Sequence, residues 1–201
     1  TREIESPVKE SLKVFVGYLA MTVPPLLILR QQAKSIKVNL FTGDFFQWGF
    51  GFIPRSALDA LRGWLMVMPF VLLVSWLTTF FFGDPGGSNP LLEMVLSSRN
   101  FLALGVLFVT TVLVAPVFEE FVFRGVLLPV LVKEQNRIIA IIFSALVFAL
   151  AHLSVGETPP LFVLGIGLAL LRLSTGRLLP CVIMHSLWNG VTFANLLILS
   201  G

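Results

Sequence analysis

Long apolar stretches, separated by short polar ones, run through the whole chain. Six of them are long or apolar enough to be candidate membrane spans: residues 14–29, 64–82, 101–132, 138–153, 160–173 and 178–199. A transmembrane α-helix needs about 20 mostly apolar residues. The stretches are continuous and do not alternate, which argues against a transmembrane β-barrel. The pattern therefore predicts an all-α fold, a polytopic transmembrane helical bundle with about six membrane-spanning segments.

Prolines fall at several places in these segments. Pro24 and Pro25 predict that the first segment kinks or ends there, because proline removes a helix hydrogen bond. Pro116 and Pro129 are expected to interrupt the third segment. The fifth segment begins at a Pro-Pro pair, which suits the first turn of a helix.

The stretches between the spans carry other signals. Residues 31–63 are rich in aromatic side chains, so we interpret them as interfacial, with a short surface helix at residues 54–62. Residues 83–90 have the composition of a loop. The glycines within residues 165–167 predict a close approach of two helices, and Arg172 and Arg177 are interpreted as interface anchors.

Composition supports a membrane protein. The chain is 56% hydrophobic and 12% charged, whereas soluble domains are about 25% charged. Its one cysteine excludes an internal disulfide. The net charge of +3 is small and the basic residues are scattered, so nucleic-acid binding is not expected. The chain begins at Thr1 and not at Met, so we expect it to be a fragment of a longer protein.

Few ionisable or amide side chains remain inside the apolar segments. A charged residue at the centre of a membrane helix costs about 2.5–3.5 kcal/mol on insertion scales, so such residues need a partner or a function. The candidates on the third, fourth and sixth segments are Glu119, Glu120, Arg124, His152, His185 and Asn189.

Spacing predicts which of these side chains share a helix face. Glu120 and Arg124 are i,i+4 neighbours, so they can form an ion pair. Glu119 points about 100° away from Glu120 and is free to face another helix. His185 and Asn189 are also i,i+4 neighbours on one face.

The depth of these residues can be compared along the helices. If the third and fourth segments form a hairpin centred near Asn136, Glu120 and His152 each lie 16 residues from that centre, or about 24 Å along the helix. The fifth segment joins the fourth to the sixth, so residues can be counted from the turns at its two ends. This count places Asn189 at nearly the same depth in the membrane as His152, with His185 one helical turn deeper. We therefore expect the polar residues of three helices at a common level.

The three motifs that contain these residues occur together in one known family. EEFVFR resembles the EExxxR motif of the CPBP family, the CAAX-protease and bacteriocin-processing (Abi) group of intramembrane proteases. FALAH resembles its FxxxH motif and HSLWN resembles its HxxxN/D motif, in the same order. The resemblance implies a helical bundle with an intramembrane polar cavity in which a peptide bond is hydrolysed. It divides one continuous membrane domain into N-terminal membrane helices with an interfacial segment, residues 1–100, and a CPBP-like catalytic core, residues 101–201.

The resemblance also implies roles for the site residues. Glu119 and His152 would position and deprotonate a water molecule, and Arg124 would pair with Glu120. The two polar residues of the sixth segment would donate hydrogen bonds to the oxyanion. No cofactor is expected under this reading.

Two alternatives remain open at this point. The set of Glu and His side chains includes ligand types that suit zinc, and a metal site would use Glu119, His152 and His185; the local H-E-x-x-H pattern is absent. The second alternative is a non-catalytic protein of the same fold that acts as a scaffold or assembly partner of a larger membrane complex. The expected partners are otherwise the lipid bilayer and a peptide or membrane-protein substrate. We expect an integral multi-pass membrane protein, and the pattern does not identify the membrane.

Overall fold

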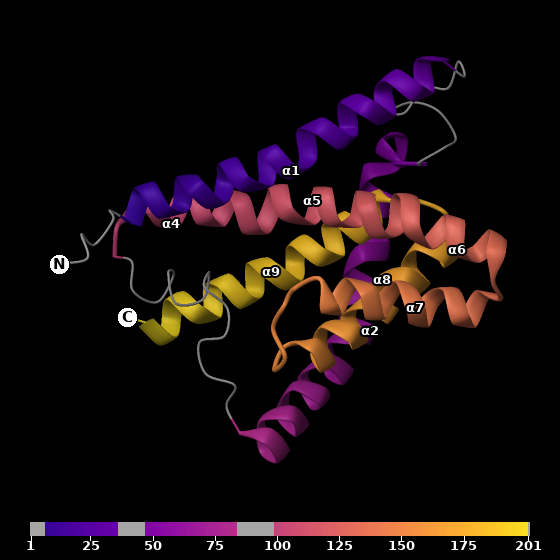
Figure 1. Ribbon diagram of the computed structural model, residues 1–201. Helices are drawn as coiled ribbons and strands as arrows, with labels where there is room; N and C mark the ends of the chain where they lie inside the picture. Colours follow the sequence, from indigo (N-terminus) through magenta and orange to yellow (C-terminus); the bar gives the residue numbers. More distant parts are fainter. Residues whose placement is uncertain (1–6, 36–46, 84–98, 201) are drawn as a thin grey trace.

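The computed structural model describes residues 7–35, 47–83 and 99–200, and every regular element in these residues is helical (Figure 1). The N-terminal elements are α1 (Pro7–Ser35), a short 3₁₀ turn η1 (Phe50–Phe52) and α2 (Ile53–Phe82). A composite helix follows, made of α4 (Phe101–Phe108), π-helical η2 (Val109–Val114), α5 (Ala115–Glu120), π-helical η3 (Phe121–Leu127) and α6 (Leu128–Glu134). The last three helices are α7 (Arg137–Leu150), α8 (Thr158–Thr175) and α9 (Leu179–Ser200).

The composite helix runs without a break from Phe101–Glu134. The expected interruptions at Pro116 and Pro129 are therefore wrong. Each proline is the second residue after a π-helical segment, in which the backbone N–H donates to the carbonyl five residues earlier instead of four. The N–H of Ala115, for example, donates to the carbonyl of Thr110. A π turn changes the backbone register beside the proline, so the helix continues although the proline N–H is missing.

The first two predicted spans are longer than expected. Helix α1 continues through Pro24 and Pro25, so the prolines do not end it. Residues 54–62 do not form a separate surface helix but the first turns of α2. In the sequence, Gly63 is the residue that separates the predicted surface helix from the second span. A single interior glycine lowers the stability of a helix by only about 1 kcal/mol relative to alanine, so the helix continues through it. Residues 36–46 of the interfacial segment and 84–90 of the loop lie outside the described residues.

Within the described residues, five helices are long and apolar enough to cross a bilayer, namely α1, α2, the composite helix, α8 and α9. Helix α7 has 14 residues, or about 21 Å, which is shorter than the roughly 30 Å hydrocarbon core. Many large apolar side chains on the outer faces are exposed, for example Met66 and Phe70 on α2, as expected for contact with lipid. The prediction of an all-α, multi-pass membrane bundle is confirmed.

The composite helix lies between α1 on one side and α7, α8 and α9 on the other (Figure 1). Helix α1 lies along α4 and η2, and α7 and α8 form an adjacent pair (Figure 1). Helix α2 packs against α8 and α9. A core of fully buried side chains joins α7, α8 and α9 through Phe148, Leu168 and Met184.

Glycines allow α8 to approach its neighbours closely, as the sequence predicted. A Cβ at Gly167 would lie 2.5 Å from a methyl group of Val67 on α2. A Cβ at Gly165 would lie 3.0–3.2 Å from backbone and Cβ atoms of Ala145 on α7. At Gly165 the backbones of α8 and α7 lie too close together for a side chain to fit.

Replacing Gly165 with Ala is expected to lower the free energy of unfolding by about 1–3 kcal/mol, since overpacking against a backbone forces the helices apart. Gly105→Ala is the matched control, because a Cβ at this helical glycine meets no heavy atom within 4 Å. The control should be neutral or slightly stabilising. Thermal unfolding of the purified protein in detergent measures both effects. Equal stability of Gly165→Ala and the parent chain would contradict the close packing described here.

Candidate active site

The deepest part of the site is an ion pair between Glu120 and Arg124. Arg124 Nη1 donates to Glu120 Oε1 at 3.0 Å, and both side chains are fully buried. The pairing follows from the i,i+4 spacing on one helix and confirms the sequence prediction. A buried pair of this kind leaves no net charge in the apolar core, and breaking it would leave one charge uncompensated.

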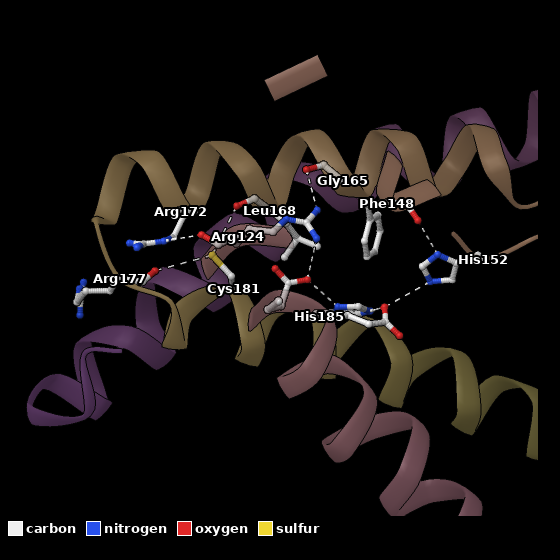
Figure 2. A network of polar contacts seen from close by, with 11 residues as sticks. Arg124, Phe148, His152, Gly165, Leu168, Arg172, Arg177, Cys181 and His185 are labelled. Atoms are coloured by element: carbon white, nitrogen blue, oxygen red, sulfur yellow. Dashed lines mark hydrogen bonds and ion pairs between the residues drawn. The ribbon is translucent and has the colours of Figure 1, made fainter. Parts of the chain in front are cut away.

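Neighbouring helices hold the guanidinium of Arg124 in place. Its Nη2 donates to the carbonyl of Gly165 at 3.1 Å, and its Cζ lies 4.3 Å from the ring centroid of Phe148, a cation–π geometry. Arg172 Nε donates to the main-chain carbonyl of Arg124 at 3.2 Å (Figure 2). Arg172 is only 7% exposed, so its interpretation as an interface anchor is wrong. The close approach of α8 at Gly165 is what brings a carbonyl oxygen within reach.

His185 connects the buried ion pair to Glu119. Its Nδ1 lies 2.8 Å from Glu120 Oε1, and its Nε2 lies 3.9 Å from Glu119 Oε2 (Figure 2). A carboxylate oxygen only accepts hydrogen bonds, so Nδ1 carries the proton and Nε2 faces Glu119. Glu120 therefore orients an imidazole as well as neutralising Arg124.

His152 lies just beyond the C-terminus of α7, not within the helix as the sequence analysis placed it. Leu153 has a φ of +53°, a left-handed conformation that turns the chain away from the helix axis and is strained for a leucine. His152 Nδ1 lies 2.8 Å from the carbonyl of Phe148, and its Nε2 lies 3.6 Å from Glu119 Oε2 (Figure 2). The carbonyl requires a proton on Nδ1, so this imidazole also presents Nε2 to Glu119.

Glu119 is where the two imidazoles meet. Its Oε1 accepts a hydrogen bond from the hydroxyl of Tyr18 at 3.3 Å. Its Oε2 faces both Nε2 atoms but has no direct hydrogen-bond partner among the described residues. The side chain of Glu119 is 14% exposed and that of His152 is 24% exposed, whereas His185 is 2% exposed. Glu119 and His152 thus form the accessible edge of an otherwise buried polar cluster.

Asn189 lies apart from the carboxylates. Its amide Nδ2 donates to the carbonyl of Thr111 at 2.8 Å, within the π-helical segment η2. The structure therefore brings Glu119, Glu120, Arg124, His152 and His185 into one connected cluster, and places Asn189 one helical turn further along α9. No direct contact joins the Asn189 amide to this cluster within the part of the chain that the structure describes.

The side chains named for a metal ion are spaced more widely than zinc ligands. Ligand atoms around a tetrahedral zinc are roughly 3.3–3.5 Å apart, given metal–ligand bonds of about 2.0–2.2 Å. The two separations at Glu119 Oε2 are 3.6 and 3.9 Å. Within residues 7–35, 47–83 and 99–200, no group of three His, Cys, Asp or Glu side chains is arranged to hold a metal ion. The donor types suit zinc, and the metal alternative stays a prediction.

Sequence reasoning missed Tyr18 and Arg172. Both are polar side chains within apolar segments, which is the signal that identified the other site residues. Tyr18 was not recognised as a site residue because its ring is largely apolar and because 101 residues separate it from Glu119 along the chain. The contact of Arg172 with the site was not recognised because this residue lies near the end of its helix, where an arginine side chain usually reaches the membrane surface.

Two comparisons with known proteins found matches to membrane proteases. Residues 101–191 match the family model described as type II CAAX prenyl endopeptidase Rce1-like. The membrane-embedded CAAX protease MroQ of Staphylococcus aureus (strain USA300) is 33% identical over 137 residues, which cover 65% of this chain and 54% of MroQ. The chain thus spans about half the length of this curated relative. No solved structure is significantly similar to the chain.

Proposed function

Since residues 101–191 belong to the CPBP family of membrane proteases, we propose that the chain is an intramembrane endopeptidase. It hydrolyses a peptide bond of a membrane-associated or lipidated substrate. The observation that carries the proposal is the convergence of His152 Nε2 and His185 Nε2 on one oxygen of Glu119. A carboxylate that faces two imidazoles, beside a buried ion pair, has the groups that general acid–base catalysis needs.

The proposed reaction begins with a water molecule held between Glu119 Oε2 and the imidazole of His152. The separation of 3.6 Å is too long for a direct hydrogen bond but suits groups that share a water. Glu119 takes a proton from the water, whose oxygen attacks the scissile carbonyl carbon. The electron pair of the carbonyl bond moves to its oxygen and forms an oxyanion. The oxyanion then re-forms the carbonyl bond as the C–N bond breaks, and Glu119 gives the proton to the leaving nitrogen.

The oxyanion requires preoriented hydrogen-bond donors. His185 donates through Nε2 when it is protonated, and Glu120 holds its ring in the required orientation. An Asn side-chain amide has two N–H donors, and Thr111 accepts one of those of Asn189. The second N–H is the one proposed to donate to the substrate oxygen. Preoriented donors of this kind are worth about 10²–10³-fold in kcat each.

The proposal is tested with purified protein in liposomes that contain membrane-anchored peptides, some prenylated and some unmodified. Mass spectrometry should detect new peptide ends with the parent chain and none with Glu119→Gln. If no peptide is cleaved and cells with Glu119→Gln keep the phenotype of the parent chain, the scaffold function replaces the protease. The participation of a larger membrane complex stays a prediction, which a pull-down from solubilised membranes checks.

Chelation distinguishes the two ways of activating water. We expect EDTA and 1,10-phenanthroline to leave the cleavage rate within about twofold of the untreated protein, because a carboxylate general base needs no metal. Elemental analysis of the active preparation should find less than one zinc per chain. Stoichiometric zinc whose removal abolishes cleavage, and whose return restores it, would contradict a mechanism based on Glu119 alone.

A further inference from the structure

A tyrosine hydroxyl lies in the middle of the first membrane span. Tyr18 is the only tyrosine of the 201-residue sequence, and it lies near the centre of the apolar window Pro7–Ile28. A hydroxyl buried away from water needs a hydrogen-bond partner. The partner of Tyr18 is Glu119 Oε1, on a different helix, at 3.3 Å.

Tyr18 belongs to the one face of α1 that turns towards the bundle. Ser11, Phe15, Tyr18, Thr22 and Leu26 are buried or half-buried and recur every three or four residues, whereas most of their neighbours on α1 are exposed. This face lies against α4 and η2 (Figure 1). Leu26 also packs against Phe121, so the face is anchored on both sides of Glu119.

The two oxygens of Glu119 have different surroundings. Oε1 accepts from Tyr18, and Oε2 faces the imidazoles of His152 and His185. A carboxylate without a partner on Oε1 could rotate about its terminal torsion, which is broad in carboxylate side chains. The hydroxyl of Tyr18 thus determines which oxygen faces the imidazoles and in what plane.

We propose that Tyr18 is a positioning residue of the active site, through which α1 fixes the carboxylate of Glu119 for proton transfer. The inference rests on the proposed protease function. It assigns a role to a helix that lies outside residues 101–191, the part of the chain that matches the family model. The site is therefore completed by α1 and not by the matched segment alone.

The kinetic test compares two variants on the same face of α1. Tyr18→Phe removes only the hydroxyl and should lower kcat about tenfold, the value of one hydrogen bond to a charged group, with KM within twofold. Thr22→Val is the control, because its hydroxyl donates to the main-chain carbonyl of Tyr18 and not to the cluster. It should leave both constants unchanged. A kcat of Tyr18→Phe within twofold of the parent chain would overturn the inference.

A spectroscopic test does not depend on turnover. Biosynthetic 3-fluorotyrosine places a single fluorine in this sequence, and its ¹⁹F resonance reports the surroundings of the Tyr18 ring. Glu119→Gln replaces the charged acceptor of the Tyr18 hydroxyl with a neutral amide and should shift the resonance. Glu134→Gln, at an exposed position at the end of α6, should not. An unchanged resonance in Glu119→Gln would overturn the contact. A shift combined with no cleavage of any peptide by the parent chain would contradict the protease function but support the contact.

Discussion

Glu119→Gln is expected to lower kcat at least about 1,000-fold while the protein still folds. General acid–base groups contribute typically 10²–10⁴-fold, and Gln has the size of Glu but cannot take a proton from water. Its amide oxygen can still accept from the hydroxyl of Tyr18, so the change affects the chemistry more than the packing. Initial rates of peptide cleavage in liposomes, together with a thermal melt in detergent, measure the two effects separately.

The control for this variant is Glu134→Gln, which makes the same chemical change at an exposed position. It should keep the kcat of the parent chain. A Glu119→Gln protein that cleaves the same peptide with a kcat within threefold of the parent chain would remove Glu119 from the mechanism. Cleavage would then require another base.

Arg124→Met is expected to produce the largest loss of stability among the single substitutions. It removes the cation that pairs with the buried Glu120 and the donor to the carbonyl of Gly165. Breaking a buried ion pair by removing one partner costs about 3–5 kcal/mol, mainly because the remaining charge is uncompensated. The shift in the midpoint of thermal unfolding, measured in one detergent for all variants, tests this expectation.

The double variant Glu120→Gln/Arg124→Met isolates the electrostatic part of that loss. With no charge left to compensate, the double variant should regain at least about half of the stability that Arg124→Met loses. Arg124→Lys should not restore full stability, because an ammonium group cannot donate from two fixed nitrogens to Glu120 and Gly165 at once. Equal melting midpoints for Arg124→Met and the parent chain would show that the pair is not needed for folding.

Local spacing predicted those parts of the site that lie on one helix or across one short turn. The pair of Glu120 and Arg124 follows from four residues of separation, and the different direction of Glu119 follows from 100° per residue. The common level of Glu120 and His152 was predicted from the short turn at Asn136, whose side chain caps α7 by accepting from the N–H of Ile139. The all-α membrane bundle could also be predicted from the sequence, because the lengths of the apolar segments match the thickness of the bilayer.

Contacts between distant segments could not be predicted in this way. The depth estimate placed Asn189 nearer the carboxylates than His185, but it assumed straight helices. In the structure His185 reaches both carboxylates and Asn189 reaches Thr111 in the π-helical segment η2. Tyr18 and Arg172 meet the cluster only through tertiary packing. The division of the chain at residue 100 into an N-terminal part and a core stays a prediction, although the contact of Tyr18 with Glu119 links the two parts.

A structure of the protein in a lipid bilayer, at a resolution that shows ordered water, is the most direct test of the convergence of Glu119, His152 and His185. We predict that Glu119 Oε2 lies within about 4 Å of both imidazole Nε2 atoms, near the separations of 3.6 and 3.9 Å. We also predict density for a shared water or a substrate carbonyl at that point. Separations greater than about 5.6 Å, the reach of two hydrogen bonds through one water, with the three side chains in separate environments, would contradict this convergence.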